Sequence, residues 1–321
     1  MKLEDVKNIA VIGAGTMGHG IAQVFAQNGF PVSLTDAVES VLAEVKKEIH
    51  SNLILLAKEG LVSDRGIEQT LDRISIVKDL NRAVRDADFV TEAIVENLQV
   101  KQDTFKKMEG FCPPATILAS NSSTLQITDI SSTMSRPERA VTTHWFNPPY
   151  IVPLVEVVCG ARTSDGTFNI AYDLLNNIGK VAVKIQKEIP GFLVNRIQAA
   201  MYREVVSLAE MGVASMEDID LAVKSSMGFR LASFGALRIM DMGGLDIWYK
   251  VFEHLLKEID SKTEVPKFIK DKAERGELGM KTGKGFFEYT PESIQALIKE
   301  RDRQFVNRLK TLYYSQEKGK G

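Results

Sequence analysis

The sequence predicts an α/β protein in which a doubly wound, mostly parallel sheet is followed by an all-α domain. Short apolar runs alternate with longer amphipathic stretches, and a glycine-rich turn follows the first run. Beyond about residue 188 the apolar residues recur every three or four positions, which is typical of helices. We therefore predict two domains, residues 1–187 and 188–321.

The alternation of strands and helices begins near the amino terminus. The apolar run 9–12 is short enough for a buried strand, and the amphipathic stretch after it ends at Asn28-Gly29, a typical helix stop. Further apolar runs predict strands over 32–35, 74–77, 89–93, 117–120, 140–143, 154–158 and 181–185, and helices are expected over about 37–60, 80–85 and 98–108. Ligands of such sheets bind at the carboxyl ends of the strands.

The second domain shows a helical period throughout. Residues 197, 201, 205 and 208 are apolar and spaced by four, four and three, and this helix is expected to stop at Gly212. Ser215 and Asp218 form an S-x-x-D start for the next helix. The apolar faces exceed what one small bundle can bury, which favours a homodimer.

The turn after the first strand has the sequence GAGTMG, a G-x-G-x-x-G pattern between a strand and a helix. Gly13 permits the tight turn, Gly15 lets the backbone approach a pyrophosphate, and Gly18 lets the helix pack on the strand. Asp36 ends the second strand, where its carboxylate can accept a hydrogen bond from a ribose 2′-hydroxyl and would repel a 2′-phosphate. The first domain is therefore predicted to be a Rossmann-type domain that binds NAD.

Composition excludes several other classes of protein. The 321 residues carry a formal net charge of −2, which offers no bulk attraction for nucleic acid or for an anionic membrane. No apolar stretch is long enough to span a membrane and the start lacks a signal-peptide core, so we expect a cytoplasmic protein. Cys112 and Cys159 have no metal-ligand spacing, and no metal is expected.

Oxidation of an alcohol by NAD needs a proton acceptor beside the hydroxyl, and imidazole has the most suitable pKa. Of the four histidines, His144 alone ends a predicted sheet strand. Glu156 lies within the next apolar run, where a buried carboxylate needs a charged partner or a hydrogen-bond donor. We expect Glu156 to orient His144; the alternative is that both are structural polar residues without mutual contact.

Seven segments together resemble the L-3-hydroxyacyl-CoA dehydrogenase superfamily. They occur in the family's order over nearly the whole chain: residues 13–18 (GAGTMG), 92–97 (EAIVEN), 119–123 (ASNSS), 144–148 (HWFNP), 154–157 (LVEV), 190–196 (PGFLVNR) and 281–286 (KTGKGF). The resemblance implies that His144 is the general base, that Glu156 orients it, and that Ser123 and Asn195 position the substrate oxygen. It also implies an NAD site formed by Gly13, Gly15, Thr16, Met17, Gly18, Asp36, Glu96, Lys101, Ser123, Asn147 and Lys281.

Other segments depart from the fatty-acyl members of that family. Val152-Pro153 stand where those members commonly have Met-Lys, and Glu59 stands where they place a lysine that meets coenzyme A phosphates. Residues 147–156, 186–188 and 227–232 are instead similar to the lambda-crystallin/L-gulonate 3-dehydrogenase and carnitine dehydrogenase branches. There Arg230 could bind a free carboxylate, or it could serve a structural ion pair or a helix end. Residues 281–287 again resemble the 3-hydroxybutyryl-CoA members.

The function expected first is NAD-dependent oxidation of the L-3-hydroxy group of a short 3-hydroxyacyl-CoA, of the 3-hydroxybutyryl-CoA type, in fatty acid metabolism. One alternative is a dehydrogenase of a free 3-hydroxy acid such as L-gulonate or L-carnitine. Another is a non-enzymatic, crystallin-like NAD(H)-binding protein. A third is a β-hydroxyacid or 6-phosphogluconate-type dehydrogenase, which would depend on a lysine rather than on His144.

Overall fold

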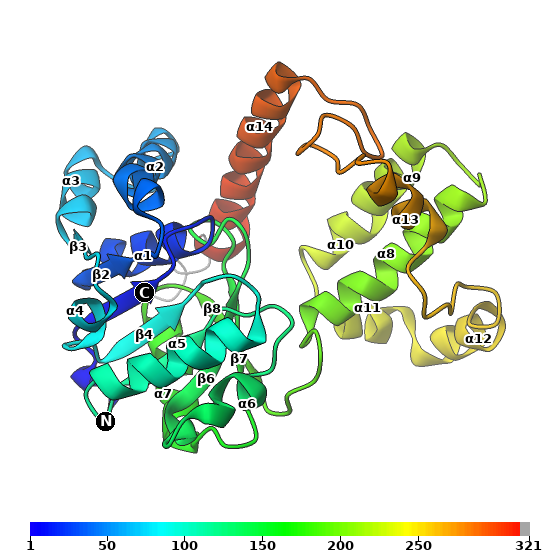
Figure 1. Ribbon diagram of the computed structural model, residues 1–321. Helices are drawn as coiled ribbons and strands as arrows, with labels where there is room; N and C mark the ends of the chain where they lie inside the picture. Colours follow the sequence, from blue (N-terminus) through cyan, green and yellow to red (C-terminus); the bar gives the residue numbers. More distant parts are fainter. Residues whose placement is uncertain (315–321) are drawn as a thin grey trace. The chain divides into compact units, whose positions relative to one another are not determined.

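The computed structural model describes residues 1–314 (Figure 1). The chain divides into two compact units, Met1–Arg196 and Ile197–Gly321. The first consists of an eight-stranded, mostly parallel sheet with helices on both faces, and the described part of the second is helical. The predicted fold class is confirmed, while the predicted domain boundary after residue 187 stays a prediction.

The sheet has the strand order β3-β2-β1-β4-β5-β6-β7-β8. Its strands are β1 (Ile9–Ile12), β2 (Val32–Thr35), β3 (Ile74–Ile76), β4 (Phe89–Glu92), β5 (Ile117–Ser120), β6 (Ala140–Trp145), β7 (Leu154–Val158) and β8 (Val181–Ile185). Strands β1 to β6 are parallel, β7 runs antiparallel to β6, and β8 is parallel to β7. Strand β7 reverses because residues 146–153 are too few for the crossover that parallel neighbours require.

Helices cover both faces of this sheet (Figure 1). They are α1 (Gly18–Gln27), α2 (Glu39–Lys58), α3 (Asp64–Asp72), α4 (Leu80–Val84), α5 (Leu98–Phe111), α6 (Ile127–Ile130) and α7 (Asp165–Asn177). The side chains of β1 alternate between two apolar clusters: Ile9 and Val11 pack with residues of α1, α2 and α7, and Ala10 and Ile12 pack with residues of α4, α5 and α6. This two-sided core leaves the loops at the strand ends free to carry the site.

Two sequence signals mark one helix end and one helix start in the second unit. The unit contains α8 (Val194–Glu210), which starts in the first unit, then α9 (Met216–Ala222), the π-helical turn η4 (Val223–Gly228), α10 (Phe229–Leu231), α11 (Ala236–Gly243), α12 (Leu245–Leu255), α13 (Lys267–Glu274) and α14 (Pro291–Leu309). Helix α8 ends before Gly212, which has a φ of 66°. The Ser215 side chain caps α9 by accepting a hydrogen bond from the Asp218 N–H at 3.0 Å.

Candidate active site

The glycine turn between β1 and α1 leaves room for a dinucleotide pyrophosphate. Gly13 has a φ of 98°, and a Cβ atom at this position would lie 2.5 Å from the Ala93 carbonyl oxygen. A Cβ at Gly18 would lie 1.7 Å from the Gly13 carbonyl oxygen, so only glycine fits where the helix meets the turn. At Gly15 a Cβ would meet nothing within 4 Å. That open space beside the amino end of α1 is where a phosphate can be bound.

Asp36 follows β2 and braces the same turn. One carboxylate oxygen accepts the Ala14 N–H at 2.7 Å, and the other accepts the Val38 N–H at 2.8 Å. Each oxygen keeps a second lone pair that can accept a ribose hydroxyl. The residues on this side of the sheet therefore fit NAD, and Asp36 also fixes the turn that would receive the pyrophosphate.

His144 and Glu156 form a buried pair across β6 and β7. The antiparallel register places the two residues directly opposite each other. The His144 Nδ1 atom lies 2.8 Å from Glu156 Oε2, and the side chains are 4% and 0% exposed. Since a carboxylate oxygen accepts, Nδ1 carries the hydrogen, and Nε2 is left with a free lone pair. The buried Glu156 thus contacts His144, the residue that we expect it to orient from the sequence.

Ser123 lies on the other side of the imidazole. Its Oγ atom is 3.1 Å from His144 Nε2, so with Nδ1 protonated the serine hydroxyl donates to Nε2. Asn195, in the first turn of α8, donates from Nδ2 to the Ser123 carbonyl oxygen at 3.2 Å. A hydroxyl donor, an imidazole acceptor and an amide thus come together from three separate segments.

The start of α8 is attached to the same glutamate. Glu156 Oε1 accepts the Val194 N–H at 2.8 Å and the Leu193 N–H at 3.2 Å. A carboxylate at the amino end of a helix is stabilised by the free N–H groups and by the helix dipole. Phe192, which precedes them with a φ of 50°, is fully buried, and its ring centroid lies 5.7 Å from that of His144. Glu156 therefore positions both His144 and the helix that carries Asn195.

Glu96 holds the loop that carries Ser123. Its Oε1 atom accepts hydrogen bonds from the Ser122 hydroxyl, from the Ser123 N–H, and from the N–H and hydroxyl of Thr124. Partial burial raises the pKa of this carboxyl, but the hydrogen bonds from Ser122 and Thr124 and the Lys101 ammonium together lower the pKa to about 2. Glu96 is therefore ionised at neutral pH.

A buried ion pair anchors this loop to the sheet. The Lys101 ammonium lies 2.6 Å from Glu92 Oε1 and 3.4 Å from Glu96 Oε2. Burial raises the pKa of Glu92, and the Lys101 charge and the Ser120 hydroxyl oppose that rise. Sequence reasoning missed Glu92. The signal was available, because Glu92, like Glu156, is a carboxylate inside an apolar run.

Models for the two domains of one protein family match most of the chain. The model of the 3-hydroxyacyl-CoA dehydrogenase, NAD binding domain, matches residues 8–189, and that of the C-terminal domain matches residues 191–289. The chain belongs to the 3-hydroxyacyl-CoA dehydrogenase family. The resemblance inferred from seven short segments is thereby confirmed.

Individual relatives carry two kinds of name. The chain is 35% identical to 5-formyl-3-hydroxy-2-methylpyridine 4-carboxylate 5-dehydrogenase of Mesorhizobium japonicum, over 94% of this chain and 96% of that one. It is 37% identical to a probable 3-hydroxybutyryl-CoA dehydrogenase of Bacillus subtilis, over 89% and 98%. A crystal structure of the pyridine-carboxylate enzyme, described as an NAD⁺-dependent dismutase, superposes with a TM-score of 0.89 at 35% identity, over 96% and 98% of the chains.

Family membership settles the class of reaction. The protein is an NAD-dependent dehydrogenase of the 3-hydroxyacyl-CoA type, an oxidoreductase of class EC 1.1.1, and NAD is its cofactor. Within residues 1–314 no helix is long and apolar enough to cross a membrane. The cytoplasmic location expected from the sequence stays a prediction.

Three further predicted site residues, Asn147, Arg230 and Lys281, are described here by their own surroundings. Asn147 is exposed and is joined to Pro148 by a cis peptide bond. Arg230 is exposed in the second unit, where its guanidinium donates to the hydroxyl and carbonyl of Ser226 one turn earlier. Lys281, also in the second unit, lines a mostly apolar cavity of about 730 Å³ between α8, α9, α13 and the segment 277–289. The NAD and substrate roles of these three residues stay predictions.

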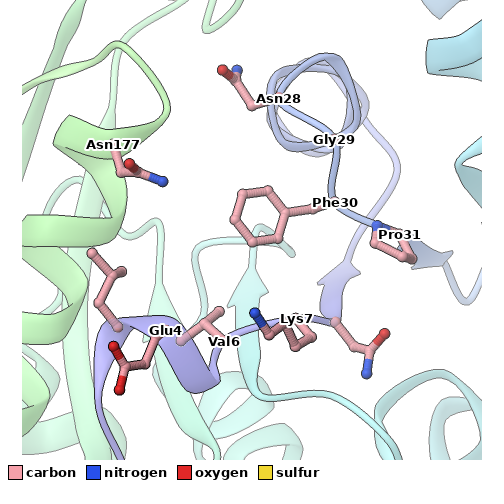
Figure 2. A pocket seen from close by; sticks show the side chains of 10 residues that line it. Glu4, Val6, Lys7, Asn28, Gly29, Phe30, Pro31 and Asn177 are labelled. Carbon is pink, nitrogen blue, oxygen red and sulfur yellow. The ribbon is translucent and has the colours of Figure 1, made fainter.

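A second hollow lies at the opposite edge of the sheet from the glycine turn. This cavity of about 660 Å³ is bordered by residues 3–8 before β1, by residues 28–31 before β2, and by Asn177. Figure 2 shows the Phe30 ring pointing into it, with Lys7 and Glu4 at its border. It contains none of the residues grouped around His144.

Proposed function

We propose that the protein oxidises the L-3-hydroxy group of a short 3-hydroxyacyl-CoA, of the 3-hydroxybutyryl-CoA type, to the 3-keto compound in fatty acid metabolism. One observation carries the proposal: His144 is held between Glu156 and Ser123 with its hydrogen on Nδ1, so that the unprotonated Nε2 can accept a proton. A protein that only bound NAD would need no such arrangement. The non-enzymatic and lysine-dependent alternatives have no comparable feature in their support.

The residues divide the chemistry between them. Bound NAD supplies a hydride acceptor. His144 Nε2 accepts the proton of the substrate hydroxyl, and Glu156 stabilises the imidazolium that forms, since its carboxylate already bonds to Nδ1. Ser123 and Asn195 donate hydrogen bonds to the substrate oxygen and hold it near Nε2. In the reverse direction the imidazolium returns the proton.

Different observations support two kinds of substrate, a coenzyme A thioester and a free carboxylate. The Bacillus subtilis relative supports a short acyl-CoA. The pyridine-carboxylate enzyme matches over more of the chain, which supports a second candidate: a dehydrogenase of a free carboxylate substrate such as 5-formyl-3-hydroxy-2-methylpyridine 4-carboxylate. Glu59, which would repel coenzyme A phosphates, and Arg230, which could bind a carboxylate, agree with this second candidate.

A panel of substrates distinguishes an acyl-CoA substrate from a free carboxylate substrate. Initial rates of NADH formation are measured with 3-hydroxybutyryl-CoA, L-gulonate, L-carnitine and the pyridine aldehyde. We expect the highest kcat/KM for 3-hydroxybutyryl-CoA. Turnover of a free acid or of the pyridine aldehyde alone, lost in Arg230→Ala, would overturn the acyl-CoA proposal in favour of the second candidate.

The role of His144 as general base is tested separately from the identity of the substrate. With the best substrate of the panel, His144→Gln should lower kcat by about 10²–10⁴-fold while leaving NADH binding unchanged. His254→Gln, an exposed histidine in α12, is the matched control and should behave as wild type. If the wild type turns over no substrate of the panel and both variants bind NADH normally, the crystallin-like alternative is supported instead.

We also propose that the protein is a homodimer. Large apolar side chains on α10, α11 and α12 are strongly exposed: Phe229 is 75%, Leu237 80% and Tyr249 68% accessible. A patch of this kind on a folded chain is typical of a protein interface. A second copy of the same chain is the simplest partner, since most oligomers of globular proteins are symmetric homodimers.

A further inference from the structure

Lys180 is a buried cation that no step of the proposed reaction uses. It precedes β8, and its Nζ atom donates to the Pro149 carbonyl oxygen at 2.5 Å and to the Val152 carbonyl oxygen at 3.0 Å. The ammonium also lies 5.3 Å from the centre of the Trp145 ring. Among the residues that the structure describes, no carboxylate forms an ion pair with it. A lone buried charge is costly, so its retention calls for a reason.

The two carbonyl groups belong to the turn that joins β6 to β7. Within this turn the N–H groups of Ile151 and Val152 donate to the Pro148 carbonyl. The turn begins directly after Asn147, and β6, which leads into it, carries His144. Lys180 therefore fastens the segment that connects the base to β7.

The same turn touches the helix of the glycine motif. A Cβ atom added at Gly20, in the first turn of α1, would lie 2.6 Å from a ring carbon of Pro149 and 3.2 Å from the Tyr150 ring. The turn is therefore in close contact with the amino end of α1, beside the open space at Gly15. A displacement of Pro149 would loosen the packing against the helix that is to bind the pyrophosphate.

We propose that Lys180 is a positioning residue for the NAD site, holding the turn 148–152 against the first turn of α1. Its two hydrogen bonds replace the water that the buried carbonyls would otherwise need. Burial lowers the pKa of Lys180 to about 7, because the ammonium is shielded from solvent. The proposal concerns cofactor affinity, so it does not depend on which substrate tail is correct.

Affinity for NADH tests the proposal directly. Lys180→Met keeps the length of the side chain and removes the donors, and Lys184→Met removes an exposed lysine of the adjoining strand β8 as a matched control. We expect Lys180→Met to bind NADH about tenfold more weakly, measured by fluorescence titration below its unfolding temperature. Lys184→Met should match wild type, and Lys180→Arg should recover part of the affinity.

Two further readouts separate positioning from a general loss of stability. In steady-state kinetics, KM for NAD should rise in Lys180→Met by a larger factor than kcat falls. In the wild type, NADH should protect the amide hydrogens of Tyr150, Ile151 and Val152 from exchange, a measurement that needs no variant to fold. NADH affinity within twofold of wild type in folded Lys180→Met, or no protection of this turn by NADH, would overturn the proposal.

Discussion

Glu156 combines two tasks at one residue, and a single substitution separates them. In Glu156→Gln the amide oxygen can still accept the Leu193 and Val194 N–H groups, but the amide nitrogen cannot accept from His144 Nδ1. The imidazole then adopts the tautomer with its hydrogen on Nε2, which cannot accept a proton. We expect kcat to fall by about 10²–10⁴-fold.

Thermal melting followed by circular dichroism is the control for Glu156→Gln. Because this variant keeps the hydrogen bonds to the start of α8, its melting temperature should stay close to that of wild type. Glu156→Ala, which frees both N–H groups, should melt at a lower temperature than Glu156→Gln. Equal activity of Glu156→Gln and wild type would contradict the assignment of Glu156 as the residue that orients the base.

Lys180 also predicts a specific dependence of stability on pH. Its pKa falls from the usual 10.5 in the unfolded chain to about 7 in the folded protein. Between these values the unfolded chain binds one more proton than the folded protein, so the free energy of unfolding rises with pH from about 7 to about 10.5. The contribution is on the order of a few kcal/mol for so deeply buried a group.

Urea denaturation at pH 7 and pH 9 measures this contribution. Wild type should gain more stability between the two pH values than Lys180→Met does, because methionine does not titrate. All other titrating groups are shared by the two proteins, so their effects cancel in the comparison. An identical gain in both proteins would show that Lys180 keeps its usual pKa in the folded state.

Two glycines of the glycine turn have different roles: Gly18 allows the helix to pack against the turn, and Gly15 leaves space for a pyrophosphate. Gly18→Ala places a methyl group against the Gly13 carbonyl and should destabilise the protein by about 1–3 kcal/mol. Gly15→Ala meets nothing in the free protein and should change stability by less than about 0.5 kcal/mol, yet it should weaken NADH binding because its methyl occupies the pyrophosphate space. Thermal melting and NADH titration of the two variants check both statements.

Strands were easier to predict than helices at this scale. Each apolar run of four or five residues became a strand, since a parallel sheet covered on both faces requires continuous apolar runs. Helices α3, α6 and α7 of the first unit were not predicted. Helix α7 contains five Asp and Asn residues, which disfavour a helix by intrinsic propensity: Asp165, Asn169, Asp173, Asn176 and Asn177. Its apolar residues are buried, and this burial overrides that preference; they are Phe168, Ala171, Leu174 and Leu175.

For the whole molecule, the homodimer yields a test of its own. Leu237→Glu on α11 and Tyr249→Glu on α12 each place a charge on the exposed apolar surface. We expect wild type to elute as a dimer in size-exclusion chromatography with light scattering, and the two variants to shift toward monomer. Lys250→Glu, which alters an already charged position of α12, is the control and should stay dimeric. A monomeric wild type would contradict the proposal.

The sequence by itself determined the cofactor and the fold class, and it led us to expect that Glu156 orients His144. These follow from local patterns: glycines at fixed spacing between a strand and a helix, continuous apolar runs, and a carboxylate inside such a run. Only the tertiary structure decided that the two side chains meet. The β6–β7 register brings Glu156 opposite His144, and a slip of one residue would turn the carboxylate to the other face of the sheet. Ser123, the start of α8 and the Lys180 ammonium reach their partners across long stretches of chain, so their contacts depend on how the strands and turns pack together.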